Sequence, residues 1–344
     1  MKILIISTTM YPLPPPGYSG LENLVYCWAC EFAKAKGHQV AVVAPGDSKF
    51  PPELNIELIT TGLREPEEAA YLKYKNRLES GEFNAIEDHT WLWHSVLSQM
   101  EAGKQLPIIH CWHTDPYSLG SPPPIAKPCL VAFSEAQANI IRSRWNACVQ
   151  VVHHGIDLNF YKPDPTVERG DRYLFLARYT PEKGFLEIAN LVKKCKVSLD
   201  AFGDTEIVGS QDYVTKCFNE ADGRQIRVNP GISREETVKQ YQSHKALITW
   251  PNYIEIFGLT ICEATACGCP VISKDSGAAR ELIKHGKSGF VVGTLEAAEE
   301  LIKSDAVSNL KTEDIIKQGR KFSIEKSAKA HLKIMESLAN GYYW

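Results

Sequence analysis

Two glutamates carry the densest chemical signal in this sequence. Glu255 and Glu263 are separated by seven residues, and nearly all of the residues around them are apolar. A helix that begins at Gly258 would place the two carboxylates at most ~12 Å apart along its axis, because each helical residue rises ~1.5 Å. The first N–H groups of this helix, from Phe257 to Leu259, would face an anion. This spacing suits a ligand that has a sugar at each end and a diphosphate in between.

The alternative for Glu255 and Glu263 is a solvated helix in which both carboxylates simply face water. Such a helix would have polar neighbours, whereas the apolar flanks here predict a helix that is substantially buried. The sequence therefore favours a ligand site.

Two cations, Arg178 and Lys183, lie five residues apart where an apolar strand gives way to a helix. Guanidinium and ammonium groups at such a turn suit a polyanion such as a diphosphate. The alternative is that both are ordinary surface cations, which is the usual position of arginine and lysine. The order of motifs along the chain, described below, favours the diphosphate.

A proline-rich loop with two glycines, Gly17 and Gly20, follows the first apolar strand. Glycine tolerates positive φ, so one interpretation is a plain loop. The other is a backbone that approaches a phosphate or a sugar at a helix N-terminus. The sequence has neither a complete Gly-x-Gly-x-x-Gly fingerprint nor a Walker A motif, which counts against a nicotinamide-dependent dehydrogenase and a P-loop enzyme.

Two histidines are candidates in the first half of the chain. His113 follows a strand predicted over 107–112, and open α/β sheets bind their ligands at such strand ends. Taken alone, a histidine in this position is more often structural. His89, within Glu87-Asp88-His89, is a weaker candidate that would line the acceptor side of a site.

The composition is that of an ordinary globular protein. Of the 344 residues, 44% are hydrophobic and 23% are charged, and the length predicts about two domains. A net charge of −3 excludes a protein that works by coating nucleic acid. No apolar run approaches the ~18 residues of a membrane span, and the apolar start is too short for a signal-peptide core.

The ten cysteines are scattered through the chain, many of them in apolar segments. This usage is typical of small buried side chains that stay reduced inside a cell, so we expect a cytoplasmic protein. Cys27 and Cys30 form one Cys-x-x-Cys pair, but no second pair with zinc spacing accompanies it. We therefore expect no metal site.

Short apolar runs alternate with amphipathic stretches along the whole chain. The predicted strands are 2–7, 38–44, 84–87, 107–112, 129–133 and 149–153, then 173–177, 197–202, 224–229, 246–250 and 270–273. The predicted helices are 21–36, 91–102 and 135–144, then 184–195, 212–220, 234–243 and 259–267. This alternation predicts two Rossmann-like, doubly wound α/β domains that face a central cleft. A polar segment with two prolines, 161–172, is the predicted linker.

These motifs resemble, in kind and in order, those of the retaining glycosyltransferases of family 4, which have the GT-B fold. The signature of that family is similar to Glu255-x7-Glu263 together with the segments 257–259 and 268–271. Further segments resemble the family's glycine loop and first helix, strand-end histidine, linker entry, donor phosphate loop and closing elements: 11–37, 110–114, 154–157, 177–184, and 277–281 with 286–290. The resemblance spans almost the whole chain.

The resemblance implies an enzyme that moves a glucose- or mannose-type group from a UDP- or GDP-linked donor to a hydroxyl of a glycan, lipid or small-molecule acceptor. Arg178 and Lys183 would hold the diphosphate, Glu263 the ribose and Glu255 a hydroxyl of the donor sugar. His113 would contact that sugar near its reacting carbon. The other donor-side residues would be Gly17, Gly20, Ile256, Phe257, Gly258 and Leu259.

Three residues depart from the family's pattern. His154 stands where an asparagine usually precedes the glycine, and Ala278 stands where a second glycine usually follows Gly277. Ile256 occupies a position where a small residue is common, so it would narrow or reshape the pocket for the donor sugar. The identity of that sugar is therefore open.

No Asp-x-Asp occurs in the sequence, so the metal-diphosphate motif of the other large glycosyltransferase fold is missing. We expect no metal and no cofactor, with a helix N-terminus, Arg178 and Lys183 stabilising the leaving diphosphate. No carboxylate is clearly placed under the anomeric carbon. This favours front-face attack with retention, in which the leaving phosphate deprotonates the acceptor.

Three other classes of protein compete with this interpretation. A nucleotide-sugar epimerase of similar fold would bind the same donor but needs no acceptor. A glycan phosphorylase would need a lysine that carries pyridoxal phosphate, and normally a longer chain. A non-catalytic nucleotide-sugar binding protein would keep Arg178 and Lys183 but would need neither Glu255 nor His113.

The predicted domains are 1–165, on the acceptor side, and 166–325, which binds the donor. A C-terminal helix over 326–344 is expected to rejoin the first domain. Nucleic acid is not an expected partner. A lipid acceptor would bring the protein to the inner face of the membrane.

Overall fold

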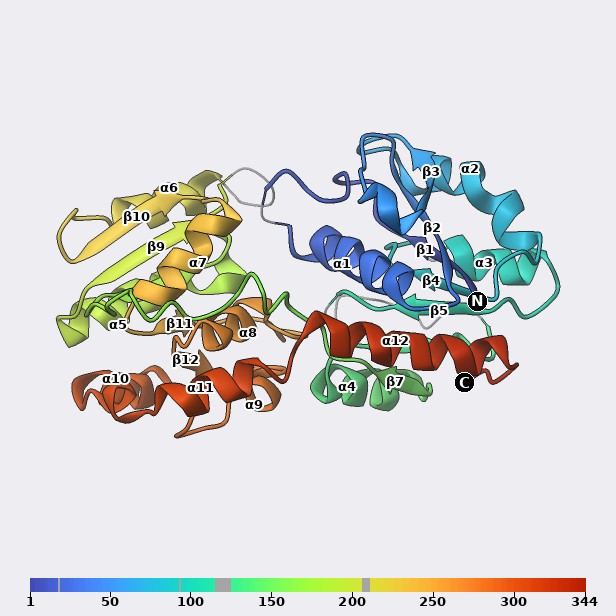
Figure 1. Cartoon of the computed structure of the whole chain (residues 1–344). Helices are drawn as coiled ribbons and strands as arrows, with labels where there is room; N and C mark the ends of the chain where they lie inside the picture. Colours follow the sequence, from blue (N-terminus) through green and yellow to red (C-terminus); the bar gives the residue numbers. More distant parts are fainter. Residues whose placement is uncertain (18, 93, 115–124, 206–210) are drawn as a thin grey trace. The chain divides into compact units, whose positions relative to one another are not determined.

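The computed structural model describes residues 1–17, 19–92, 94–114, 125–205 and 211–344 (Figure 1). Position 18 of the glycine loop and position 93 of the helix predicted over 91–102 lie outside the described residues. The chain divides into two compact units. Unit 1 consists of Met1–Gly155 and Ile324–Trp344, and unit 2 consists of Ile156–Ser323.

Unit 1 is built on a parallel sheet of seven strands (Figure 1). Along the sheet they are β3 (Glu57–Thr61), β2 (Gln39–Pro45), β1 (Lys2–Ile6), β4 (Ala85–Asp88), β5 (Ile108–Cys111), β6 (Leu130–Ala132) and β7 (Val149–Val151). Strand β1 pairs with β2 on one side and with β4 on the other, so the strand order reverses at β1. Strand β4 is buried along its whole length although it ends in Glu87 and Asp88.

The helices of unit 1 are α1 (Gly20–Lys34), α2 (Glu67–Glu79), α3 (His94–Glu101), α4 (Glu135–Trp145) and α12 (Ile324–Ala339), with the short helix η1 (Pro52–Leu54). Because side chains alternate along a strand, Leu4 and Ile6 of β1 share one face, where they belong to the same buried cluster as Tyr71 and Tyr74 of α2. These large apolar side chains form the core on that face.

Helix α12, from the end of the chain, packs beside α1 in unit 1. The indole Nε1 of Trp28 donates to Ser327 Oγ at 3.0 Å, and that hydroxyl donates to the carbonyl of His153 at 2.7 Å. Trp28 is fully buried, so these bonds join α1, α12 and the end of the β7 segment inside the unit.

Unit 2 is built on a parallel sheet of six strands (Figure 1). Along the sheet they are β10 (Ile226–Pro230), β9 (Leu199–Gly203), β8 (Tyr173–Leu176), β11 (Leu247–Thr249), β12 (Val271–Lys274) and β13 (Gly289–Val292). The helices are α5 (Phe185–Cys195), α6 (Gln211–Asn219), α7 (Arg234–Ser243), α8 (Leu259–Ala266), α9 (Ala279–Leu282), α10 (Leu295–Lys303) and α11 (Thr312–Gly319), with η2 (Pro181–Lys183) and η3 (Ala306–Asn309). The strand order again reverses at the first strand of the unit, β8.

The prediction of two doubly wound α/β domains is confirmed, but their boundary differs from the predicted one. Unit 2 begins at Ile156 rather than after Pro165, and the segment predicted as a linker lies within it. Tyr161 is buried. The guanidinium of Arg169 donates to the backbone carbonyl of Tyr241 at 2.8 Å, and the N–H of Gly170 donates to the backbone carbonyl of Ser243 at 2.7 Å. The segment is mostly exposed, but it is attached to unit 2 through Tyr161 and through these bonds to α7.

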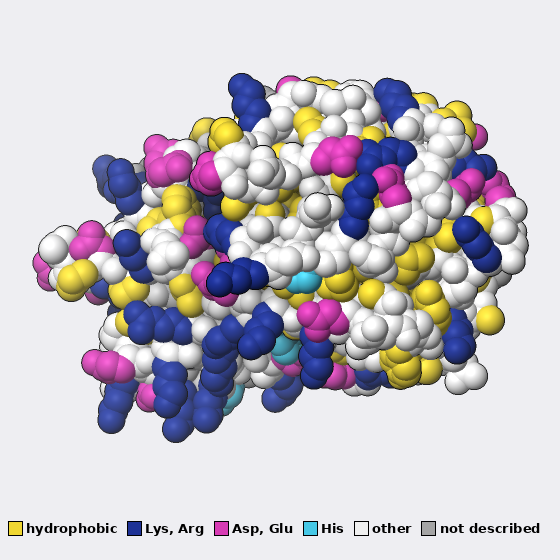
Figure 2. Space-filling model, turned by 45° about the vertical axis from the view of Figure 1, so that its right-hand side comes forward, with side chains coloured by type: hydrophobic (Ala, Val, Ile, Leu, Met, Phe, Trp, Pro, Cys, Tyr) yellow, Lys and Arg dark blue, Asp and Glu magenta, His cyan; other side chains and the backbone are white. Residues whose placement is uncertain are grey.

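The surface drawn in Figure 2 is mixed in character. Hydrophobic side chains lie singly or in small groups among polar ones, and Lys and Arg side chains gather in the lower left part of the view. Within the described residues, no helix has the length and apolar character that crossing a membrane requires.

The packing of α12 leads to a prediction about stability. Replacing Ser327 with alanine leaves the buried Trp28 N–H and the His153 carbonyl without this partner, so we expect Ser327→Ala to lower the free energy of unfolding by ~1–3 kcal/mol. Urea denaturation measures it. Ser337→Ala, on the same helix, is the control, since that hydroxyl bonds only within the helix, to Lys333. Equal stability of the two variants would contradict the packing described for α12.

Candidate active site

The switch point of the unit 2 sheet, between β8 and β11, gathers most of the predicted donor residues. The loop after β8 carries Arg178 and Lys183, the loop after β11 carries Glu255, and the loop after β12 carries Gly277. All strands run in parallel, so these loops meet at the same edge of the sheet. Open α/β sheets bind ligands at this edge, beside the strand where the order reverses.

Lys183 and Glu255 form an ion pair at this edge, with Tyr253 joined to both. Lys183 Nζ lies 2.8 Å from Glu255 Oε2, and Tyr253 OH donates to the same oxygen at 2.5 Å. Lys183 Nζ also donates to Tyr253 OH and lies 4.6 Å from the centre of its ring. The structure therefore brings Lys183 and Glu255, which the sequence places in the same site only through the family resemblance, into direct contact. It also adds Tyr253, which the sequence analysis did not predict.

The protonation of this cluster follows from its charges. Burial acts to raise the pKa of Glu255, but the charge and hydrogen bond of Lys183 and the hydrogen bond from Tyr253 outweigh it, so that pKa is lowered. Burial and then the charge of Glu255 raise the pKa of Tyr253. At neutral pH the carboxylate is thus ionised and the phenol is a neutral donor.

Arg178 is the more accessible of the two predicted diphosphate ligands. Its side chain is 43% exposed, and its closest carboxylate contact is Glu182 at 3.9 Å. Its charge also helps to lower the pKa of Glu255. Arg178, Lys183 and Glu255 therefore share one electrostatic environment.

A glycine holds the loop after β8 against the loop after β11. Gly184 has a φ of 68°, and a Cβ atom there would lie 2.0 Å from the carbonyl oxygen of Trp250. Asn252 N–H donates to the carbonyl of Glu182 at 2.7 Å. No larger residue fits at Gly184 without moving the loop that carries Lys183.

The loop after β12 packs against the backbone of Glu255. Gly277 has a φ of 51°, and a Cβ atom there would lie 1.9 Å from the carbonyl oxygen of Glu255. Ala278 N–H donates to that same oxygen at 3.0 Å, and Ser276 Oγ donates to the carbonyl of Tyr253 at 2.5 Å. The position of Glu255 therefore depends on a glycine at 277, whereas Ala278 is accommodated.

The start of α8 lies directly beyond Glu255. Gly258, the residue before the helix, has a φ of 98°, and Leu259 is the first residue of α8. Phe257 is buried and packs edge-on against Phe322, with ring centres 5.8 Å apart. Ile256, between Glu255 and Phe257, is partly exposed. The first N–H groups of α8 therefore follow Glu255 within a few residues along the chain.

Glu263 lies on α8 with its side chain buried. Tyr241 OH donates to Glu263 Oε2 at 2.9 Å. The pKa of Tyr161 is raised by burial and then by the charge of Glu263, which places this second tyrosine beside the carboxylate. Glu263 is thus held by two tyrosines and does not belong to the Lys183 cluster.

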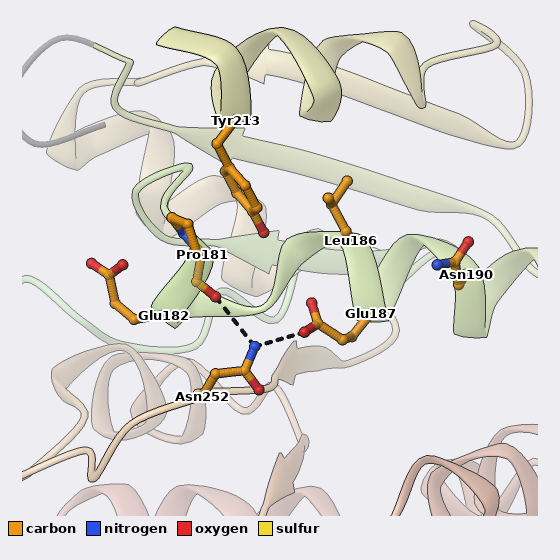
Figure 3. A pocket seen from close by; sticks show the side chains of 7 residues that line it. All are labelled: Pro181, Glu182, Leu186, Glu187, Asn190, Tyr213 and Asn252. Carbon is orange, nitrogen blue, oxygen red and sulfur yellow. Dashed lines mark hydrogen bonds between the residues drawn. The ribbon is translucent and has the colours of Figure 1, made fainter. Parts of the chain in front are cut away.

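A pocket of about 520 Å³ adjoins the loop after β8 (Figure 3). It is lined by Pro181, Glu182, Leu186, Glu187, Asn190, Tyr213 and Asn252. The amide of Asn252 donates to the carbonyl of Pro181 at 3.2 Å and to Glu187 at 2.6 Å. These bonds fix the loop on the pocket side.

In unit 1 the corresponding switch point lies between β1 and β4. Helix α1 begins there at Gly20, and Glu22 in its first turn accepts hydrogen bonds from Thr8 at 2.5 Å and from Ser19. Among the described residues, a Cβ atom at Gly17 would meet nothing within 4 Å, so the packing of those residues does not require glycine there. The glycine loop is thus anchored at its helix end.

The two predicted histidines are in direct contact. His89 Nδ1 and His113 Nε2 are 2.8 Å apart. Burial, and then the charge of neighbouring histidines with His89 first, holds the pKa of His113 well below its ordinary value. His113 is therefore neutral at pH 7. His89 is completely buried, so its side chain is placed behind His113 and not on a surface that an acceptor would touch.

A buried cluster behind His89 was not predicted. Oxygen, nitrogen and sulfur atoms of Glu87, His89 and Cys111 lie within 4.8 Å of one another. Glu87 Oε1 is also 2.7 Å from Nδ1 of His331 on α12. Glu87 and His89 are two residues apart on one strand and its extension, so they share a face, which the sequence does signal. The contribution of His331 depends on the fold.

Two family models match the chain. Glycosyltransferase Family 4 matches residues 18–160, and Glycosyl transferases group 1 matches residues 161–322. The chain belongs to glycosyltransferase family 4. Its activity class is therefore that of a glycosyltransferase, as the resemblance predicts.

Named relatives of this family 4 glycosyltransferase are distant in sequence and close in fold. The D-inositol 3-phosphate glycosyltransferase of Nocardioides sp. is 24% identical over 308 residues, which is 74% of this chain and 67% of that relative. The sucrose-phosphate synthase of Thermosynechococcus elongatus has a TM-score of 0.77 at 16% identity, covering 99% of this chain and 100% of that one. Anabaena HepE, in complex with UDP and glucose, has a TM-score of 0.75 at 18% identity, covering 98% and 100%.

These likenesses establish the GT-B fold for this glycosyltransferase. The chain spans between 47% and 67% of the length of the first three curated relatives that it matches.

The support that Gly277 gives to Glu255 can be tested. Gly277→Ala would both strain the backbone and clash with the Glu255 carbonyl, so we expect it to lower the free energy of unfolding by more than about 3 kcal/mol. Gly286→Ala is the matched control, because Gly286 has a φ of 73° but nothing within 4 Å of its Cβ position. That variant should lose only the ~1–2 kcal/mol of the left-handed conformation. Equal losses in urea denaturation would show that Gly277 does not support Glu255.

Proposed function

We propose that this glycosyltransferase moves a glucose- or mannose-type hexosyl group from a UDP- or GDP-linked donor to an acceptor hydroxyl, with retention of configuration. The observation that carries this proposal is the Lys183–Glu255–Tyr253 cluster at the switch point of unit 2. It places an ionised carboxylate, which suits sugar hydroxyls, directly beside cations, which suit a diphosphate.

Lys183 and Arg178 are assigned to the diphosphate. An ammonium group has three N–H donors. Two of those on Lys183 are directed to Tyr253 and Glu255, and the third is the donor that we assign to a phosphate oxygen. Arg178, with its exposed guanidinium, supplies the second cation. Both would stabilise the negative charge that grows on the diphosphate as the glycosidic bond breaks, with help from the N-terminus of α8.

Glu255 is assigned to the donor sugar. Both of its hydrogen bonds, from Lys183 and from Tyr253, are made to Oε2. Oε1 is therefore the oxygen that we assign to a sugar hydroxyl. Ile256 follows directly and would limit the size of the sugar next to it.

Glu263 is assigned to the ribose. Its Oε2 is held by Tyr241, which fixes the carboxylate on α8. The carboxylate would accept hydrogen bonds from the ribose hydroxyls. The N–H groups of Gly258 and Leu259, between the two glutamates along the chain, would then face the diphosphate.

In unit 1, His113 is assigned to the donor sugar near its reacting carbon. A neutral imidazole offers one donor and one acceptor, so it can bind a sugar hydroxyl without adding charge. Gly17 and Gly20 would bring backbone N–H groups of the glycine loop to the same part of the donor. His89 acts through His113.

The proposed mechanism is front-face attack without a metal ion or cofactor. Arg178, Lys183 and the α8 N-terminus would do the work of a cation, and no Asp-x-Asp is present in the sequence. The leaving phosphate would take the proton of the acceptor hydroxyl, because no carboxylate is assigned to a position under the anomeric carbon.

The acceptor class is a glycan, a lipid or a small molecule. Two of the named relatives are called after phosphorylated sugars or polyols, inositol 3-phosphate and sucrose-phosphate, so small phosphorylated polyols belong in the first panel of acceptors. Anabaena HepE, in complex with UDP and glucose, makes UDP-glucose the first donor to test. The pattern of cysteines favours the cytoplasm, and a lipid acceptor would bring the enzyme to the inner face of the membrane.

The test is product analysis with labelled donors. The purified chain is incubated with UDP-glucose, GDP-mannose and their relatives in the presence of the acceptor panel, and the product is examined by NMR. We expect the anomeric configuration of the donor to be retained. An inverted product would contradict the mechanism, and isomerisation of the donor without transfer would identify an epimerase.

Chelation provides the control for the metal-free mechanism. The same reaction with EDTA should proceed at an unchanged rate. Loss of transfer that Mg²⁺ or Mn²⁺ restores would assign the stabilisation of the diphosphate to a metal ion instead of Arg178 and Lys183.

A further inference from the structure

Two buried groups in unit 1, Glu87 and His89, connect in turn to the partly buried His113 and form a line with it. Glu87 Oε1 lies 3.3 Å from His89 Nε2, and His89 Nδ1 lies 2.8 Å from His113 Nε2. The side chains of Glu87 and His89 are completely buried. A carboxylate thus faces one side of an imidazole whose other side faces the histidine assigned to the donor sugar.

The aromatic rings around this line remove the rotational freedom of both histidines. Trp28 stacks on His89, with ring centres 5.3 Å apart and planes at 14°. Phe133 stacks on His113, with centres 4.6 Å apart and planes at 25°. Phe133 also stacks on His154, with ring centres 3.8 Å apart. Rings held in this way respond to hydrogen bonding by moving protons between their nitrogens rather than by turning.

The positions of the protons then follow from Glu87. Nε2 of His89 lies 3.3 Å from the ionised Glu87 carboxylate, and this negative charge favours a proton on that nitrogen. In a neutral imidazole the other nitrogen is then an acceptor, so His89 Nδ1 accepts a hydrogen bond from the Nε2–H of His113. This leaves Nδ1 of His113 bare, as an acceptor for a hydroxyl of the substrate.

Burial by itself would protonate Glu87, but its neighbours prevent this. His331 Nδ1 lies 2.7 Å from Glu87 Oε1, and Cys111 Sγ donates to the same oxygen at 3.4 Å. Burial acts to raise the pKa of Glu87, but the neighbouring histidines, His331 first, outweigh it and hold that pKa low. The carboxylate is thus kept ionised inside the unit.

We propose that Glu87 is a positioning residue for transfer: acting through His89, it fixes His113 as the tautomer with a proton on Nε2 and a bare Nδ1. This proposal rests on the assignment of His113 to the donor sugar. It gives His89 a defined task, and it gives the buried Glu87 at the end of β4 a function.

A bound metal ion is the competing explanation for the same atoms. Glu87, His89 and Cys111 have the chemistry of zinc ligands and are close enough together. Zinc would bind Cys111 as a thiolate, and a bound ion would itself remove the thiol proton, so metal analysis of the purified protein distinguishes the two explanations. In this structure the thiol of Cys111 donates a hydrogen bond to Glu87, so it has a partner without a metal ion.

The tautomer can be read directly by NMR. The full chain is labelled with ¹⁵N-histidine, and long-range ¹H–¹⁵N spectra distinguish bare from protonated ring nitrogens; His113→Gln identifies the signals of His113 among the ten histidines. We expect one tautomer in the wild type, protonated on Nε2. A proton on Nδ1 in the wild type would overturn the proposal without any variant of Glu87.

Glu87→Gln tests whether the carboxylate is the cause. The glutamine amide has nearly the same shape but donates as well as accepts, so both tautomers of His113 should become populated. Cys111→Ala is the matched control, since it removes another contact of the same Glu87 oxygen without touching the line to His113, and its spectrum should be that of the wild type. His89→Asn should act like Glu87→Gln and replaces it if that variant does not fold.

Kinetics supply the readout that a purely structural role would not move. Glu87→Gln should lower kcat roughly ten- to a hundredfold, the scale of a small misplacement at a reaction site, while KM for the donor nucleotide sugar stays within about twofold. Cys111→Ala should change neither constant. Equal effects of the two variants, or a rise in KM alone, would contradict the proposal, and so would one zinc per chain in metal analysis of the purified protein. Absence of any transfer, with the expected tautomer in the spectrum, would count against the proposed function and leave the positioning by Glu87 intact.

Discussion

A largely buried carboxylate has to be neutralised by its neighbours, and the donor half of this glycosyltransferase is arranged around one such group, Glu255. Removing an ionised side chain from water costs several kcal/mol unless opposite charge and hydrogen bonds replace the solvent. Lys183 and Tyr253 do this at one carboxylate oxygen. The pair brings the loops after β8 and β11 together, and Gly184 allows their backbones to touch.

The same constraint explains features that are otherwise unconnected. The loop after β12 approaches the backbone of Glu255 so closely that only glycine fits at 277. This contact fixes the backbone that carries the carboxylate. Lys183 is thereby oriented for a second anion. A donor diphosphate would bind next to a lysine and an arginine whose positions the fold has already determined, which lowers the ordering cost of binding.

Unit 1 also contains a buried carboxylate, Glu87, but different residues surround it. Glu87 lies on β4, beside the strand where the order reverses, just as Glu255 follows β11 in unit 2. In unit 1 the groups next to the carboxylate are histidines, His331 and His89, instead of a lysine. A hydrogen bond at one ring nitrogen of histidine determines whether the other nitrogen is a donor or an acceptor, and lysine has no such property. Glu87 in unit 1 therefore sets the position of a proton on His113, whereas Lys183 in unit 2 compensates the charge of Glu255.

The sequence predicts the central strands and the donor motifs well, because both are local. Apolar runs such as Lys2–Ile6 and Val271–Lys274 can only be buried strands, and Lys183 and Glu255 are marked by their spacing to glycines. The edge strand Glu57–Thr61 and the polar helix Glu67–Glu79 were not predicted, since neither has a clear apolar period. The cluster around Glu87 was also missed, because His331 reaches it from the far end of the chain.

The central claim, that unit 2 binds a nucleoside diphosphate through Arg178 and Glu263 in separate roles, is tested most directly by calorimetry. A nucleoside and its diphosphate are titrated into the variants Arg178→Ala and Glu263→Ala, with the wild type as reference. Glu263→Ala should weaken both ligands by the ~1.5–3 kcal/mol of hydrogen bonds to a charged group, because it removes the ribose contact. Arg178→Ala should weaken the diphosphate and leave the nucleoside unchanged. If Arg178→Ala weakened both ligands equally, the phosphate site would have to lie elsewhere.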